Sequence, residues 1–473
     1  MQFQSFIFLQ FFLLFYASYL LLTKNLKAQN LLLLAASYIF YGYWDWRFLS
    51  LLIFSTVIDF LISHRIDRTS NNKRRPLLLS LSLISNLSIL GFFKYFNFFA
   101  SSFTNLLDSI GIPANDITLK IILPVGISFY TFQTLSYTID VYRRDLKPAK
   151  SILDFAVYVA FFPQLVAGPI ERATNFLPQI SSLRKISLSQ VNAGIFLILW
   201  GYFKKLVIAD NVANIANPIF DNYTQYQGLD IILGILAFTI QIYCDFSAYS
   251  DIARGLAKLM GFELMVNFKL PFFAINPSDF WSRWHISLSS WLRDYLYIPL
   301  GGNRRGEFNT YRNLFLTMLL GGLWHGAAWN FILWGAYQGL ILIIYRLFDK
   351  QPEHLDPWSS KYPAYRVLGK MLLMFILANI GWVIFRSTSL EQISYLLTQG
   401  GLALSENSVN LLRDLLFFAF PLFIVQLCQY VSKDLLIVPK VTSWIRISIY
   451  SFFLMLIFIY GVRTSSEFIY FQF

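Results

Sequence analysis

Charged residues are scarce in this sequence. They make up 14% of its 473 residues, and hydrophobic residues reach 56%, whereas soluble proteins carry roughly 25% charged residues. This composition excludes a disordered chain, a nucleic-acid-binding domain and an ordinary cytosolic enzyme. Because one transmembrane helix needs ~20 apolar residues, the chain has room for about a dozen membrane spans. The composition therefore predicts a polytopic membrane protein.

Residues that build cofactor and metal sites are also few. The two cysteines, Cys244 and Cys428, lie far apart in apolar surroundings and indicate no disulfide framework. The sequence contains no metal-ligand spacing, no Walker-type or dinucleotide-binding glycine loop and no GxSxG nucleophile motif. We therefore expect no bound metal or cofactor and no nucleic-acid partner.

Long apolar runs cover most of the chain. Several of them are short or interrupted, so we expect an all-α polytopic membrane protein with about 11 to 13 transmembrane or re-entrant helices. The runs fall at about 3–23, 29–45, 48–64, 76–98, 119–141, 152–166, 191–213, 229–250, 311–324, 327–346, 365–386, 412–432 and 441–462.

Basic residues follow alternate runs. The formal net charge is +12, and Lys and Arg concentrate in short loops after the first, third and fifth apolar runs. This alternation indicates an N-terminus outside the cytoplasm and basic loops inside it, next to anionic membrane lipid. We therefore expect a multi-pass protein of the cell inner membrane. The basic loop residues are Lys24, Lys27, Arg65, Arg68, Lys73, Arg74, Arg75, Arg143, Arg144, Lys147 and Lys150.

One stretch, residues 271–312, breaks the membrane pattern. It contains the segments DFWSRWH (279–285), WLRDY (291–295) and GGNRR (301–305). Its charge is too high for a lipid-facing span, and its Trp and Tyr content is too high for a plain solvated loop. Because polar backbone at membrane depth must be surrounded by protein or water, we expect an interfacial or re-entrant segment that borders a cavity.

His325 is the strongest candidate for chemistry. It lies in the segment LLGGLWHGAAW (319–329), and residues 313–345 contain no charged side chain. An ionisable group at such depth is costly and usually faces a functional cavity, and the flanking glycines allow a bend or a close approach. The alternative is a core histidine hydrogen-bonded to a neighbouring helix. Burial disfavours the charged imidazole, which leaves a neutral ring able to act as a general base.

The other three histidines are weaker candidates. His285 lies in the polar stretch, where a merely interfacial histidine is an equal alternative. His64 stands beside Arg65, and His354 lies in the polar segment 349–358. We expect these last two to be solvated or interfacial.

Two carboxylates, Asp245 and Asp251, lie in one apolar run. Their spacing of six residues corresponds to about 600° of helical rotation, or about 240° net, so they do not share a helix face. We expect them to hold an arginine or orient a histidine, and not to form a paired acid–base site.

Several long motifs in one order resemble the membrane-bound O-acyltransferase family. The resemblance is strongest to its alginate O-acetylation branch, which acetylates extracellular polysaccharides, and weaker to the transferase that D-alanylates lipoteichoic acid. It covers about residues 35–345 and the final segment 468–473, with one departure at Ala248, where glycine is expected. The matching segments are PVGISF (124–129), QTLSY (133–137), DVYR (140–143), FPQLVAGPI (162–170), FKK (203–205), CDFSAYSD (244–251), 281–303 and GLWHG (322–326).

This resemblance implies a many-helix fold around a central funnel or tunnel that connects the two membrane faces. We expect one domain, 1–473, in which helices at 365–462 follow the family core. The resemblance implies that His325 is catalytic and that His285 lies in the segment leading to the reaction tunnel, so both are candidate catalytic residues. The candidate substrate-binding residues are Trp324, Asp245 and the arginines Arg283, Arg293, Arg304 and Arg305, to which Arg312 is added as a further basic residue.

The resemblance also implies an O-acyltransferase. We expect acetyl-CoA, or a related acyl thioester, as the cytoplasmic donor, because arginine suits an anionic donor; plain topology anchoring is the alternative role of each arginine. The acceptor would be a hydroxyl of an extracytoplasmic polysaccharide or of a periplasmic relay partner. The alternatives are D-alanyl transfer, acyl transfer to lipids or proteins, and a non-catalytic transporter of acyl groups. The transporter predicts an internal repeat with paired discontinuous helices, which the sequence does not contain.

Overall fold

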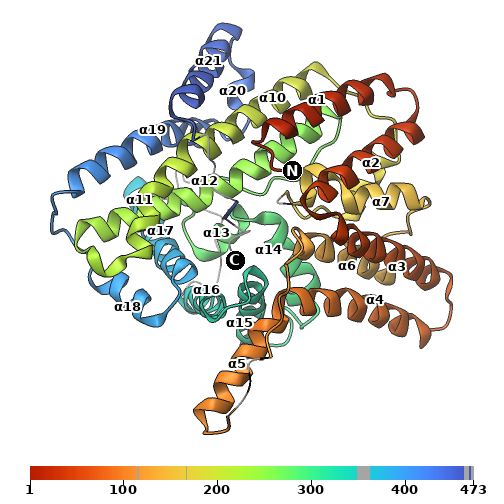
Figure 1. The fold of residues 1–473 in the computed structure, drawn as a ribbon, viewed down its shortest axis with the longest axis horizontal. Coiled ribbons are helices and arrows are strands. Elements are labelled where there is room, and N and C mark those ends of the chain that lie inside the picture. Colours follow the sequence, from red (N-terminus) through yellow and green to blue (C-terminus); the bar gives the residue numbers. More distant parts are fainter. Residues whose placement is uncertain (114, 116, 167, 349–362, 463–467, 470–473) are drawn as a thin grey trace. The chain divides into compact units, whose positions relative to one another are not determined.

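The computed structural model describes every residue except 114, 116, 167, 349–362, 463–467 and 470–473. The described residues form helices and loops without a β-strand (Figure 1), which confirms the all-α fold class. Among them, eight helical segments are long and apolar enough to cross a membrane, so the chain is a multi-pass membrane protein. These segments are Leu26–Arg68, Arg74–Ser109, Leu188–Asp221, Leu229–Leu259, Trp329–Phe348, Ala364–Arg386, Ser408–Ser432 and Ser443–Tyr460.

There are fewer long segments than apolar runs, because the runs 29–45 and 48–64 join in one segment and four runs form no such segment, namely 3–23, 119–141, 152–166 and 311–324. The chain packs as two compact units. The first comprises residues 1–191 and 256–265. Its helices are α1 (Phe6–Leu21), α2 (Leu26–Asp45), η1 (Trp46–Phe48), α3 (Leu49–Arg68), α4 (Arg74–Leu90), η2 (Gly91–Tyr95), α5 (Phe96–Ser109), α6 (Ile127–Arg143), α7 (Ile152–Ala160), α8 (Phe162–Leu165) and α9 (Ala173–Ile180).

Phenylalanine builds much of the core of the first unit. The rings of Phe8, Phe15 and Phe40 surround that of Phe162 at centroid distances of 5.4 to 6.5 Å. In the same unit, α6 begins later than the apolar run at 119 predicts. The reason is local, because Pro124 has no N–H to donate and Gly126 takes a left-handed conformation with a φ of 75°.

The second unit comprises residues 192–255 and 266–473. It contains the polar stretch 271–312, which folds into short helices and turns instead of one span. Its helices are α10 (Leu188–Tyr202), η3 (Phe203–Ala209), α11 (Asp210–Asp221), η4 (Tyr223–Gln225), α12 (Leu229–Leu259), η5 (Pro271–Phe273), α13 (Pro277–Arg283), α14 (Ile286–Leu292), η6 (Arg293–Tyr297), α15 (Glu307–His325), α16 (Trp329–Phe348), α17 (Ala364–Arg386), α18 (Leu390–Thr398), α19 (Ser408–Ser432), α20 (Ile437–Lys440) and α21 (Ser443–Tyr460). The first residues of α10 and the last residues of α12 belong to the first unit.

Close helix packing in the second unit depends on glycine. A Cβ atom at Gly201 of α10 would lie 2.8 Å from the carbonyl oxygen of Ala248 in α12 and 2.6 Å from the side chain of Ile252. The bare glycine therefore lets the two helices touch through their backbones. This contact brings η3, a π-helical stretch that continues α10, against α12.

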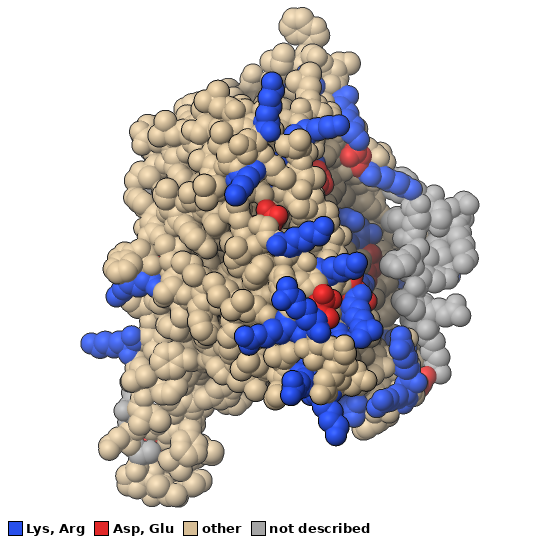
Figure 2. Space-filling view, turned by 90° about the vertical axis from the view of Figure 1, so that its right-hand side faces the viewer, with Lys and Arg blue, Asp and Glu red and all other residues tan. Residues whose placement is uncertain are grey.

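The surface is mostly uncharged. Figure 2 shows one face of the molecule, on which Lys and Arg side chains clearly outnumber those of Asp and Glu. This excess agrees with the formal net charge of +12. Large apolar side chains are exposed on many helices, as expected for surfaces that face lipid.

Candidate active site

His325 is the last residue of α15 and lies in aromatic surroundings. Its side chain is buried, with 5% of the residue exposed. The imidazole centroid lies 5.0 Å from the ring of Trp334, edge to face, 5.1 Å from Trp324 and 5.6 Å from Phe385. The three rings come from α15, α16 and α17. They exclude most water from the imidazole, as the apolar context in the sequence predicts.

The position of His325 depends on an intimate contact between α15 and α16, which lie side by side (Figure 1). A Cβ atom at Gly322 would lie 2.2 Å from the carbonyl oxygen of Phe331 and 2.9 Å from the Cα atom of Gly335. No residue with a side chain fits there without moving one of the two backbones. Glycine at both positions therefore fixes the distance between the end of α15 and Trp334.

His285 lies next to His325. The two imidazole centroids are 6.2 Å apart, and that of His285 is 5.8 Å from Trp324. The ring of Phe246 in α12 covers His285 edge to face at 4.7 Å. The residue is completely buried, and burial lowers the pKa of His285 to about 3, so its imidazole is neutral at physiological pH.

The backbone of His285 is strained. Its φ of 44° and ψ of 52° place it in the left-handed region between α13 and α14, which residues with a side chain rarely adopt. Conformations of this kind cost about 1–3 kcal/mol and persist where the surrounding structure imposes them, often at functional sites.

Asn267 imposes this turn. Its side-chain oxygen accepts hydrogen bonds from the backbone N–H of Ser287 at 3.1 Å and from the Ser287 hydroxyl at 2.8 Å. Its backbone oxygen accepts from the N–H of Ile286 at 3.0 Å. Its side-chain nitrogen donates to the Ser250 hydroxyl of α12 at 3.2 Å. The buried amide thus ties the residues after His285 to α12.

Tryptophan residues extend the aromatic surroundings beyond the two histidines. The ring of Trp334 lies 5.8 Å from Trp281 and 6.3 Å from Trp382, and Trp382 lies 4.7 Å from Trp284. Within the described part of the chain, the buried indole N–H groups of Trp281, Trp334 and Trp382 meet no hydrogen-bond acceptor. The site therefore combines apolar walls with hydrogen-bond donors, as expected for a small-molecule site.

Asp245 precedes Phe246 in α12 and is held by a buried lysine. Its carboxylate is 2.7 Å from Lys205 Nζ, which is also 3.0 Å from the Asp210 carboxylate. The backbone N–H of Ile469, near the chain end, donates to Asp245 at 2.7 Å. Asp251 instead pairs with Lys204 at 2.8 Å. The two carboxylates thus have separate partners, as their spacing predicts.

The arginines predicted to bind a donor differ in their exposure. Arg283 is partly buried and donates to Asp279 at 2.7 Å. Arg293 is exposed beside Asp294, and Arg304 and Arg305 are exposed in a turn. Hence the structure brings His285, His325 and Trp324 together. Asp245 pairs with Lys205 instead, and Arg293, Arg304 and Arg305 lie at the surface.

Two histidines have no place in this cluster. The Nδ1 atom of His64 lies 2.9 Å from the carbonyl oxygen of Phe60 in its own helix, whereas His354 lies outside the described residues. The described residues also include no group of three or more His, Cys, Asp or Glu side chains that could hold a metal ion.

Sequence reasoning missed Asn267 and the aromatic residues of α16 and α17. Asn267 is a lone amide in an apolar segment, which is a weak signal. Trp334, Trp382 and Phe385 are distant in sequence from His285 and stand in ordinary apolar helices, so only the packing of the chain identifies them.

Comparison with known proteins finds one family and several related enzymes. The sequence profile of the membrane-bound O-acyltransferase family matches residues 144–380. A protein of Pseudomonas putida named probable alginate O-acetylase is 44% identical over 397 residues, which covers 83% of this chain and 78% of that protein. The peptidoglycan O-acetyltransferase of Helicobacter pylori is 38% identical over 394 residues, which covers 78% and 73% of the two chains. The teichoic acid D-alanyltransferase of Bacillus subtilis is 30% identical over 249 residues, or 50% and 61%.

Proposed function

Because the chain belongs to the membrane-bound O-acyltransferase family, we propose that it transfers an acetyl group from a cytoplasmic thioester, acetyl-CoA, to a hydroxyl of an extracytoplasmic polysaccharide or of a relay partner. The family makes the chain an O-acyltransferase. An acetyl group is the proposed acyl group because the relatives named O-acetylase and O-acetyltransferase share more sequence identity with the chain than the D-alanyltransferase does. The proposed location is the inner membrane, with the N-terminus outside the cytoplasm.

The observation that carries the mechanism is the pair of buried imidazoles, 6.2 Å apart, within aromatic walls. In the proposed reaction His325 accepts the proton of the acceptor hydroxyl. The oxygen attacks the thioester carbonyl carbon, so that a C–O bond forms and the carbonyl oxygen becomes negative. When this intermediate collapses, the C–S bond breaks and the thiolate takes the proton from the His325 imidazolium.

Neutral donors would stabilise the negative oxygen. The His285 imidazole is neutral and can donate one N–H, and the Trp334 indole N–H lies in a ring that contacts His325. Hydrogen-bond donors that are already oriented in a site without water usually contribute strongly to the rate enhancement. Trp324 would contact the acyl group, since its ring touches both histidines.

The test is His325→Ala. General-base catalysis contributes about 10²–10⁴-fold, so transfer of labelled acetyl from acetyl-CoA to polysaccharide in membranes should fall by that factor. The matched control is His64→Ala, because the His64 ring bonds the Phe60 carbonyl of its own helix, and this variant should keep the wild-type rate of acetyl transfer. The thermal midpoint Tm in detergent shows whether each variant is folded. Near-normal acetylation by a folded His325→Ala protein would overturn the assignment.

The same assay separates the alternatives. If the purified chain transfers D-alanine from a loaded carrier protein and not acetyl from acetyl-CoA, the donor assignment is wrong. A preference for long-chain acyl-CoA would instead favour lipid or protein acylation. A relay partner is tested by adding periplasmic proteins, because direct transfer to the polymer needs none.

A further inference from the structure

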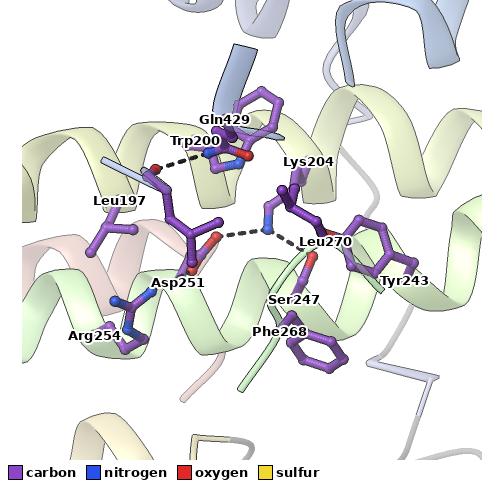
Figure 3. Close-up of a pocket in the computed structure, with 11 residues that line it drawn as sticks. Leu197, Trp200, Lys204, Tyr243, Ser247, Asp251, Arg254, Phe268, Leu270 and Gln429 are labelled. Atoms are coloured by element: carbon purple, nitrogen blue, oxygen red, sulfur yellow. Dashed lines mark hydrogen bonds and ion pairs between the residues drawn. The ribbon is translucent and has the colours of Figure 1, made fainter. Parts of the chain in front are cut away.

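A small pocket lies in the second unit, apart from the two histidines. It is bounded by α10, η3, α12, the segment 268–270 and the end of α19 (Figure 3). Its cavity volume is about 30 Å³, and the cavity is partly open to the surroundings. A single charged group matches this size better than a sugar polymer or a whole nucleotide cofactor does.

The charged side chains of the pocket are two cations and one anion. Lys204 Nζ lies 2.8 Å from the Asp251 carboxylate and donates to the Ser247 hydroxyl at 2.7 Å (Figure 3). Arg254 lies on the other side of Asp251, with its Nη1 atom 3.2 Å away. The lysine and arginine side chains are 2% and 6% exposed. One carboxylate therefore serves two buried cations, and the pocket holds an excess positive charge.

Part of the Arg254 guanidinium is available to a ligand. Its Nε atom is buried and meets no hydrogen-bond acceptor within the described residues. Leaving a buried donor of a charged group unpaired is costly. Guanidinium donors form a planar fork that matches phosphate and carboxylate oxygens. An anion with several oxygen atoms would therefore suit the unpaired donor of Arg254 in this pocket.

Two of the three candidate spans around the pocket end near it, while Lys204 lies midway along the third, Leu188–Asp221. Arg254 is in the last turns of α12, which ends at Leu259, and Gln429 is in the last turn of α19, which ends at Ser432. The polar headgroups of lipids lie at the ends of membrane-spanning helices. The other walls, Trp200 and Phe268, are aromatic and suit the apolar part of an amphiphile.

We propose that Arg254 and Lys204 bind the phosphate of an anionic lipid headgroup in this pocket. A soluble phosphate ester has the same chemistry, but the position of the pocket at the helix ends favours the lipid. This assignment is separate from acyl transfer, since none of the pocket residues is given a role in that reaction.

The experiment uses the full chain in detergent with equal amounts of phosphatidylglycerol and phosphatidylcholine, analysed by native mass spectrometry. We expect phosphatidylglycerol to be retained preferentially by the wild type. Arg254→Gln removes the excess charge and should reduce this preference about tenfold, because a hydrogen bond to a charged group contributes that much or more. The control, Arg413→Gln, removes an exposed arginine from α19 and should keep the preference.

Two further measurements keep the proposal falsifiable. If Arg254→Gln does not fold, Arg254→Lys retains the charge, and we expect it to keep part of the preference. A rise in Tm with inorganic phosphate in pure phosphatidylcholine, abolished by Arg254→Gln, without enrichment of phosphatidylglycerol, would support the anion site and assign it to a soluble ester. Equal lipid binding by wild type and Arg254→Gln, with no effect of phosphate, would overturn the proposal.

Discussion

His285 combines a left-handed backbone with complete burial. Burial lowers the pKa of its imidazole to about 3, compared with about 6.5 in water. Below pH 6.5 the unfolded chain therefore binds a proton that the folded protein does not bind. The folded state loses stability as the pH falls from about 6.5 towards 3.

His285→Asn removes this titration. We expect its Tm to fall less between pH 7 and pH 5 than the wild-type Tm does, measured by thermal unfolding in detergent. The quantity compared is the change with pH, so a constant loss of stability in the variant does not matter. Parallel curves for His285→Asn and wild type would contradict the burial argument.

Asn267 acts through the turn that it holds, so it is a positioning residue. Asn267→Ala leaves the buried N–H of Ser287 without its acceptor, which costs about 1–3 kcal/mol. Since His285 then loses its fixed position, we expect kcat for acetyl transfer to fall at least about tenfold with little change in KM.

The matched control for Asn267 is Asn379→Ala. Asn379 is a buried amide that bonds Thr239 and the Phe375 carbonyl and does not bond the residues that follow His285. It should lose similar stability but keep kcat. If both variants lose kcat in proportion to stability, Asn267 has only a structural role.

At the level of whole elements, the contact between α15 and α16 sets the place of His325. Gly322→Ala would put a methyl group 2.2 Å from the Phe331 carbonyl oxygen. The helices must separate, which costs about 1–3 kcal/mol, and His325 moves with the end of α15. We expect a lower Tm and a loss of acetyl transfer.

The control is another helical glycine. Nothing lies within 4 Å of a Cβ atom at Gly369 in α17. Gly369→Ala should leave transfer unchanged and be neutral or stabilising by about 0.5–1 kcal/mol. Full activity and stability in Gly322→Ala would show that α15 and α16 have room for a methyl group at this position.

The sequence allowed most helices to be predicted, but not all their bounds. Apolar runs identify α10, α12 and α17, because each is continuous and long. They misplace the start of α6, where backbone conformation at Gly126 overrides hydropathy. His325 is predicted as a site residue because an ionisable side chain in an apolar run is rare, and the structure shows that it is buried among aromatic rings. Trp382 and Phe385 could not be found, since their role depends on contacts between residues distant in sequence.

For the whole molecule, the basic loops predict the orientation in the membrane. Residue 72 lies in the basic loop after α3 and is expected in the cytoplasm, whereas residue 109, at the far end of the span Arg74–Ser109, is expected outside. We expect Ser109→Cys, in a Cys428→Ser background, to react with an impermeant maleimide on intact cells. Asn72→Cys should react only after the membrane is permeabilised. The reverse labelling would invert the proposed orientation.

The paired lysines of η3 have a consequence for how the protein is made. A single charged side chain inside a bilayer costs up to about 2.5–3.5 kcal/mol on insertion scales, and Lys204 and Lys205 are adjacent within the span Leu188–Asp221. Three carboxylates neutralise them, and two of these, Asp245 and Asp251, are translated later, with α12. During synthesis the ribosome therefore delivers a helix that is a poor anchor until its partner emerges, so that α10 and α12 are best released into lipid as a pair.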